Sequence, residues 1–339
     1  MKDQPISITI RGREVTKTII ITSIAILLVD NLIWLILVGA FILGSIFIPY
    51  FLSIRNFINL VYHSTPLAVL AIAQAIALTS GNFDLSIEST LAFSVAIPAI
   101  LMTSFGLNPY AGIFLVLLIG AGVGSVNGFL VGKLKVNPFL VTLAMLIMLR
   151  GLVLYLVPLT LTGFPDQFNF VGSAKLFIVP VSIIVVIGVY FVFHIVLTQM
   201  RFGREIVSVG GNKNAAFVAG INVNSTIVKV LILSGTLAGL AGLIMAGRLE
   251  SVMSPMGEGM VFMSFAAAVM GGVSLQGGIC PIHGVFAGVL VIGLIENTLS
   301  LMHISPYIVY AVKGLLIFVA IIIDRFKVDI RTRILMRQK

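Results

Sequence analysis

The chain has 339 residues, of which 59% are hydrophobic and only 10% are charged, and its mean hydropathy is +1.16. Soluble domains carry roughly a quarter charged residues, so this composition excludes a soluble globular protein. The apolar runs are continuous over about 20 residues and do not alternate with period two, which predicts helices and excludes an outer-membrane barrel. The sequence therefore predicts an all-α membrane protein that crosses the bilayer many times.

Ten apolar runs qualify as membrane spans, so we expect a polytopic bundle of about ten transmembrane helices. The expected spans lie near 25–48, 60–80, 88–105, 111–131, 139–161, 177–198, 226–247, 259–273, 283–302 and 307–323. A transmembrane domain (25–323) would then lie between a basic N-terminal segment (1–24) and a basic tail (324–339). An even number of spans puts both basic ends on one side, which the positive-inside rule predicts to be the cytoplasm.

The net charge of +9 comes mostly from the two ends of the chain. In this setting the basic residues are a topology signal, and we expect no nucleic acid as a partner. The single cysteine, Cys280, excludes an internal disulfide. The first apolar run follows a long polar segment and has no small-residue cleavage site after it, so it is expected to be a retained span and not a signal peptide.

Two segments interrupt the helical pattern. Ser80-Gly-Asn-Phe-Asp-Leu-Ser86 joins two spans without a clear loop, and Gly271-Gly-Val-Ser-Leu-Gln-Gly-Gly278 ends a span that is too short to cross alone. Non-helical backbone at membrane depth is tolerated only where protein buries it or where it lines a cavity. Broken helices near 80–88 and 271–281 therefore indicate a transport pathway. The alternative is that the glycines only permit tight helix turns.

Polar side chains inside the apolar runs are costly and suggest function. The pathway candidates are Asn82, Asp84, Ser86, Ser274, Gln276, Glu296 and Asn297. Asp84 could instead bind hydroxyl groups or cap the helix that follows. Arg150 could pair with a carboxylate inside the bundle, and Lys313 could extend toward an interface. The four histidines have no metal-ligand spacing, so no metal site is expected.

Glycines recur every four residues along the span expected at 111–131. They are Gly120, Gly124, Gly128 and Gly132, which share one helix face, and Gly235/Gly239 and Gly284/Gly288 repeat the spacing. Small faces let helix backbones approach closely in lipid. We interpret these positions as packing features.

Residues 199–225 form a polar island in the apolar chain and contain Arg201, Arg204 and Lys213. The charge bias puts this segment on the cytoplasmic side, and its length is too short for an enzyme domain. We expect it to be a docking surface for a cytoplasmic partner. The chain has no hydrolase, metalloprotease or phosphate-loop motif, so it is expected not to be an enzyme, and any ATP must be bound by another chain.

Four motifs in order resemble the ribose/xylose-type permeases of ABC transporters, the monosaccharide branch of the carbohydrate uptake transporters. They are Ser80–Ser86, Lys135–Leu143 with Arg150-Gly151, Arg201-Phe-Gly-Arg204 with Gly210–Ile221, and Gly271–Gly278. The match covers roughly residues 30–325. The resemblance implies a bacterial inner membrane permease, in which two permease chains form the pathway. ATP-binding subunits lie beneath the permeases, and a periplasmic or extracellular sugar-binding protein delivers the solute.

The resemblance also implies that the island contains the helix that docks in the ATP-binding subunit, with ATP and Mg²⁺ bound by that partner and no cofactor in this chain. The coupling residues would be Gly210, Gly211, Asn212, Asn214, Ala215, Ala216, Gly220 and Ile221. A helix is expected at 214–219, with Gly220 ending it in a left-handed conformation.

The chain departs from the family pattern at Asn82, at Glu88 and at Cys280-Pro281. These departures leave the solute open: a monosaccharide, a polyol or a furanose is expected, moved by two copies of this chain or by one copy with a related permease. Permeases for nucleosides or branched-chain amino acids share the general architecture and are the nearest alternative. A carrier coupled to an ion gradient is a further alternative, but it would not need a docking island.

Overall fold

A computed structural model describes residues 32–305, 308–309, 311–315, 318–319 and 322. Within them, seven helices are long and apolar enough to span a membrane. These are α3 (Ile54–Thr79), α4 (Ile87–Phe105), α5 (Pro109–Gly128) with its continuation η1 (Phe129–Lys133), α6 (Pro138–Leu156), α8 (Val181–Gln199), α11 (Val223–Leu249) and α13 (Ile282–Leu301). The prediction of an all-α polytopic bundle is confirmed.

Two apolar helices are shorter: α2 (Leu32–Phe47), whose first residue is also the first described one, and α12 (Met260–Met270). α12 confirms that the span expected at 259–273 is too short to cross alone. The expected tenth span, 307–323, lies only partly among the described residues, and those described are helical. The expected segments 1–24 and 324–339 lie outside the described residues.

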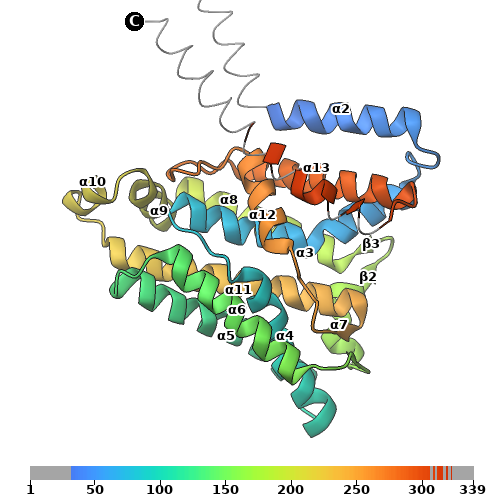
Figure 1. Cartoon of the computed structure of the whole chain (residues 1–339), viewed down its shortest axis with the longest axis horizontal. Helices are drawn as coiled ribbons and strands as arrows, with labels where there is room; N and C mark the ends of the chain where they lie inside the picture. The colour runs from blue at the N-terminus through green and yellow to red at the C-terminus, as the bar shows by residue number, and fades with distance from the viewer. Residues whose placement is uncertain (1–31, 306–307, 310, 316–317, 320–321, 323–339) are drawn as a thin grey trace, which may run out of the picture.

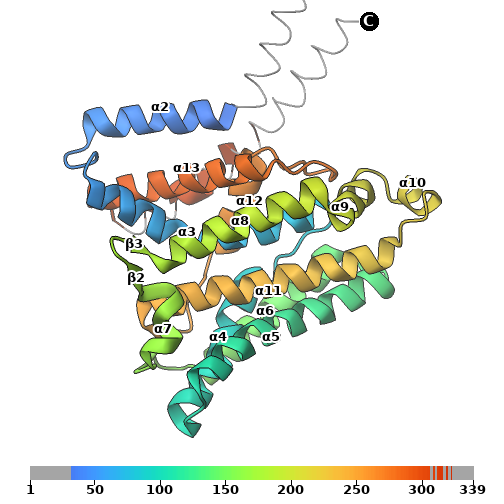
Figure 2. The same cartoon turned by 180° about the vertical axis from the view of Figure 1, so that it is seen from behind.

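Short elements cover the two ends of the bundle (Figure 1, Figure 2). One end carries α9 (Arg201–Gly211) and α10 (Lys213–Val218); the other carries α7 (Asp166–Ser173) and the hairpin of β2 (Lys175–Leu176) and β3 (Val179–Pro180). We call them the α10 end and the α7 end. At the α7 end, β1 (Leu161–Thr162) pairs antiparallel with β4 (Ser251–Val252). The span expected at 139–161 is therefore too long: α6 ends at Leu156, just before Pro158, which cannot continue a helix.

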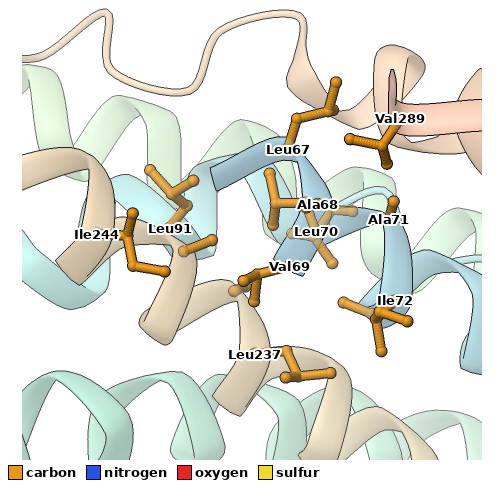
Figure 3. Close-up of a cluster of buried hydrophobic side chains, with 14 of the residues drawn as sticks. Leu67, Ala68, Val69, Leu70, Ala71, Ile72, Leu91, Leu237, Ile244 and Val289 are labelled. Atoms are coloured by element: carbon orange, nitrogen blue, oxygen red, sulfur yellow. The ribbon is translucent and has the colours of Figure 1, made fainter. Parts of the chain in front are cut away.

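α3 forms the centre of the bundle. Residues 64–79 of this helix are buried on every face, as expected for a helix that is apolar all round. Figure 3 shows Val69 and Leu70 of α3 among Leu91 of α4, Ile244 of α11 and Val289 of α13. This core holds α3 in place, and α3 terminates at Thr79, near the α10 end of the bundle.

The predicted glycine face packs α5 against α11. A Cβ on Gly120 or Gly124 would collide with the backbone of α11 at Gly235 or Leu231, and one on Gly128 would lie 3.0 Å from the backbone of Val228. Glycines therefore let these two helices touch through their backbones, and the packing interpretation is confirmed. In the same way, Gly284 and Gly288 of α13 contact the backbones of Gly271 and Ala267 at α12 and its end.

Candidate coupling surface and broken helices

The polar island folds into two short helices at the α10 end. Asn212 separates α9 from α10 and caps α10, because its Oδ1 accepts from the Ala215 N–H at 3.0 Å. Gly220 follows α10 with φ +80°, and the Ile221 N–H donates to the Ala216 carbonyl at 3.0 Å. This left-handed ending at Gly220 is the predicted one. The helix itself is Lys213–Val218, one residue earlier than expected.

α10 presents an apolar tip that the sequence did not reveal. Phe217 is 73% exposed and Val218 is 86% exposed, whereas Ala216 is buried in a small cluster with Val209 and Ile227. Ala216 is therefore the only buried side chain of α10, whereas two large apolar side chains of the helix are exposed. The signal was available, since Phe217-Val218 are the only large apolar residues between Val209 and Ile221.

Gly210, at the end of α9, touches both broken segments. A Cβ on Gly210 would collide with the Thr79 carbonyl oxygen and lie 2.7 Å from the Gly278 nitrogen. The Gly278 N–H donates to the same Thr79 carbonyl at 2.9 Å. We name this contact of Gly210, Thr79, Gly277 and Gly278 the glycine junction. It joins the base of α10, the end of α3 and the loop after α12 through backbone atoms alone.

The first break, residues 80–86, is an extended segment buried in protein. Asp84 is 1% exposed. Its Oδ1 accepts from the Ser86 N–H and hydroxyl at 3.0 and 2.6 Å, and its Oδ2 accepts from the Ser234 hydroxyl of α11 at 2.7 Å. Asn127 of α5 donates to the Ser86 hydroxyl at 2.9 Å. Asp84 thus binds the N–H at the residue that precedes α4, as a capping role requires, and the hydroxyl groups of Ser86 and Ser234.

The neighbouring Asn82 completes this buried group. Its Nδ2 donates to the Ser80 hydroxyl at 2.9 Å, and it is 1% exposed. Its Oδ1 and the Oδ1 of Asn127 are buried and have no hydrogen-bond partner among the described residues. The bonds of Asp84 tie the break to α11, and the bond of Asn127 ties it to α5.

The other pathway candidates lie elsewhere. Ser274 is half-buried and Gln276 is exposed in the second break, where the Gln276 N–H donates to the Ser274 hydroxyl at 3.2 Å. Near the end of α13, Glu296 pairs with Lys313 at 2.6 Å and Asn297 donates to Asn56 at 3.0 Å. Lys313 therefore has a carboxylate partner. The seven candidates thus belong to three segments of the described chain: the first break, the second break and the end of α13.

Glu88 and Arg150 form a buried ion pair that the sequence indicated only in part. Their side chains meet at 3.3 Å, so the expected carboxylate partner of Arg150 is confirmed as Glu88. Arg150 also donates to the Ser254 carbonyl at 2.8 Å, and Glu88 accepts from the Val261 N–H at 3.2 Å. The Glu88 carboxylate thus binds both Arg150 of α6 and one of the free N–H groups in the first turn of α12.

Known proteins share the sequence over most of its length. The family model described as "Branched-chain amino acid transport system / permease component" matches residues 56–321. The L-arabinose transport system permease protein AraH of Escherichia coli (strain K12) is 35% identical over 288 residues, covering 85% of this chain and 88% of AraH. No solved structure gives a significant match.

Two further relatives are as similar. The ribose import permease protein RbsC of Bacillus subtilis (strain 168) is 36% identical over 289 residues, 84% of this chain and 89% of RbsC. The D-allose transport system permease protein AlsC of Escherichia coli (strain K12) is 34% identical over 286 residues, 84% of this chain and 87% of AlsC. The family match, these relatives and the membrane-spanning bundle show that the chain belongs to the permease family of ABC importers. It is a multi-pass inner-membrane permease subunit, which transports a solute and is not an enzyme.

Proposed function

We propose that this permease imports a monosaccharide or a similar small polyhydroxylated solute. The relatives named for arabinose, ribose and allose support a sugar, because each is aligned over more than four-fifths of both chains. The description of the family names branched-chain amino acids, which makes an amino acid the alternative solute. The identities to the three sugar permeases are nearly equal, so they favour sugars as a class and no single sugar.

We further propose that α10 docks in a cleft of the ATP-binding subunit. Phe217 and Val218 support this, since a helix that lays an apolar face in a groove is a common mode of recognition. Asn214, Ala215 and Gly211 are exposed beside them, so small or polar neighbours leave the tip free to enter a cleft. Ala216 and Ile221 hold α10 on the bundle, and Asn212 and Gly220 set its two ends.

The glycine junction is the observation that carries the coupling proposal. Because Gly210 contacts Thr79 and Gly278 without side chains between them, a displacement of α10 and α9 must reach both breaks. Interiors are packed too closely to absorb such a shift locally. ATP would act by favouring one arrangement of the breaks over the other.

The proposed assembly has two permease chains around the pathway, ATP-binding subunits at the α10 end and a solute-binding protein at the α7 end. Both termini would then be cytoplasmic, and the partner subunit would hold ATP and Mg²⁺. The pathway candidates remain part of this proposal. Among them only Gln276 is exposed in the single chain, so contact of solute with Asn82, Asp84 or Ser86 requires the first break to open.

Reconstitution in vesicles tests this function. The permease, its ATP-binding subunit and its binding protein should take up a radiolabelled pentose or hexose when ATP is supplied to the ATP-binding side. Vesicles that lack the ATP-binding subunit are the control and should take up none. Uptake that an ion gradient drives without that subunit would contradict the importer, and ATP-dependent uptake of leucine but of no sugar would contradict the solute class.

A further inference from the structure

A cavity of about 710 Å³ lies between α9 and the first turns of α11. Neither the apolar tip of α10 (Phe217 and Val218) nor the two breaks line it. Figure 2 shows these two helices adjacent at the α10 end. Arg201, Phe202 and Glu205 of α9 line one side, and Lys229, Ile232 and Leu233 of α11 line the other. The volume lies within the range of small-molecule sites. Gly220, which ends α10, also lines the cavity, but the six residues named above have no part in the proposed docking of α10.

The charges favour an anion. Glu205 is bound by Arg201 at 2.9 Å, so its charge is compensated within the wall. Lys229 has no carboxylate at ion-pair distance within the part of the chain that the structure describes, and its ammonium lies over the Phe202 ring, 5.9 Å from the centroid. Two cations and one carboxylate therefore leave the cavity net positive, with Lys229 exposed to a ligand.

The order of polar and apolar groups along α11 favours an amphiphile. Lys229 lies six residues after Val223, or about 9 Å along the helix from its start. In the proposed orientation, with the start of α11 at the cytoplasmic membrane surface, this is a depth typical of the boundary between headgroups and acyl chains. Ile232 and Leu233 follow one turn deeper and are partly exposed. The cavity thus has its cations at headgroup depth and its apolar wall below them.

We propose that this cavity binds the phosphate group of an anionic phospholipid of the cytoplasmic leaflet, with Lys229 and Arg201 at the phosphate and an acyl chain along Ile232 and Leu233. Basic pockets between membrane helices on the cytoplasmic side suit such headgroups. The inference rests on the proposed orientation of the α10 end, but not on the solute or on the docking of α10. A bound lipid would brace α9 against α11, next to the glycine junction.

Native mass spectrometry of the full chain, titrated with phosphatidylglycerol, tests the proposal. Lys229→Gln should reduce the affinity for the first bound lipid by roughly tenfold, as for the loss of one charge-assisted contact. Lys133→Gln is the matched control, because Lys133 lies at the same end, also 5.9 Å from an aromatic centroid, but outside the cavity. It should bind lipid like the unchanged chain. Equal binding by the two variants would overturn the proposal.

Three further arms complete the test. Arg201→Gln should weaken lipid binding, whereas Arg204→Gln, on the same helix but outside the cavity, should not. If Lys229→Gln fails to fold, this pair of variants tests whether the cavity binds the lipid. Phosphatidylcholine and glycerol phosphate should bind weakly, and equal binding of glycerol phosphate would point to a free-phosphate site in place of a lipid site. If the effect of Lys229→Gln disappears when the ATP-binding subunit is bound, the cavity is a partner interface and the lipid proposal fails. None of these measurements depends on sugar uptake, so the lipid proposal and the proposed function can fail separately.

Discussion

Asp84 is a carboxylate buried in the middle of an apolar bundle, and its environment explains how it is tolerated. Three donors from Ser86 and Ser234 satisfy its two oxygens, and no cation pairs with it among the described residues. A buried polar group is costly unless hydrogen bonds compensate it. Asp84 therefore stabilises the conformation of the first break and holds it against α11. Without this carboxylate, the donors of Ser86 and Ser234 would be left without an acceptor.

Substitutions at Asp84 should separate this role from direct contact with solute. Asp84→Asn keeps one oxygen acceptor, and the Ser234 hydroxyl can rotate to accept from the new amide, so a loss of about 1 kcal/mol in unfolding free energy is expected. Asp84→Ala leaves the donors of Ser86 and Ser234 unpaired and should cost about 2–5 kcal/mol. Thermal unfolding in detergent measures both. A folded Asp84→Asn protein with no uptake would contradict the structural role and favour contact with solute.

At the scale of the elements, Glu88 and Arg150 connect three helices. Glu88 lies in the first turn of α4 and Arg150 lies on α6. Glu88 accepts a hydrogen bond from the Val261 N–H in the first turn of α12. α12 has no side-chain cap of its own, so a carboxylate from another helix satisfies its free N–H group, with a favourable contribution from the helix dipole. This pair fixes where the short α12 begins and thus where the second break follows.

A double-mutant cycle should reveal this link. Arg150→Met removes the counter-ion of the buried Glu88 carboxylate, so it is expected to lower the unfolding free energy by about 3–5 kcal/mol. Glu88→Gln should cost less, because Arg150 keeps its hydrogen bonds to the Ser254 and Met256 carbonyls. The double variant should lose less than the sum of the two. Denaturation in detergent measures all three. Additive losses would show that the two side chains do not act as a pair.

For the whole molecule, the sequence predicts the class of fold and the position of both breaks, because each depends on local composition. The glycine stripe predicts close helix packing for the same reason, but the partner helix α11 is known only from the structure. Asp84 and Gly210 show where such prediction stops. Their partners, Ser234 and Thr79, lie 150 and 131 residues away along the chain, and no local pattern indicates them. Only the packed bundle shows that the polar island and both breaks meet at one contact.

The glycine junction also changes which residue is most informative for coupling. The sequence singles out Gly211 as well as Gly210, yet a Cβ on Gly211 would meet open space, while one on Gly210 would meet Thr79 and Gly278. The tight position is therefore Gly210. Its substitution should disturb the contact between the coupling segment and the breaks without touching the exposed tip of α10.

The most direct test of this account is sugar uptake per ATP hydrolysed, measured in vesicles that contain the complete importer with Gly210→Ala. An added methyl group costs about 1–3 kcal/mol where packing is this close. The contact must therefore shift, and uptake per ATP should fall clearly below that of the unchanged importer. Gly188→Ala, whose Cβ on α8 meets open space, should leave the ratio unchanged. A folded Gly210→Ala importer that binds its ATP-binding subunit and keeps the normal ratio would contradict coupling through the glycine junction.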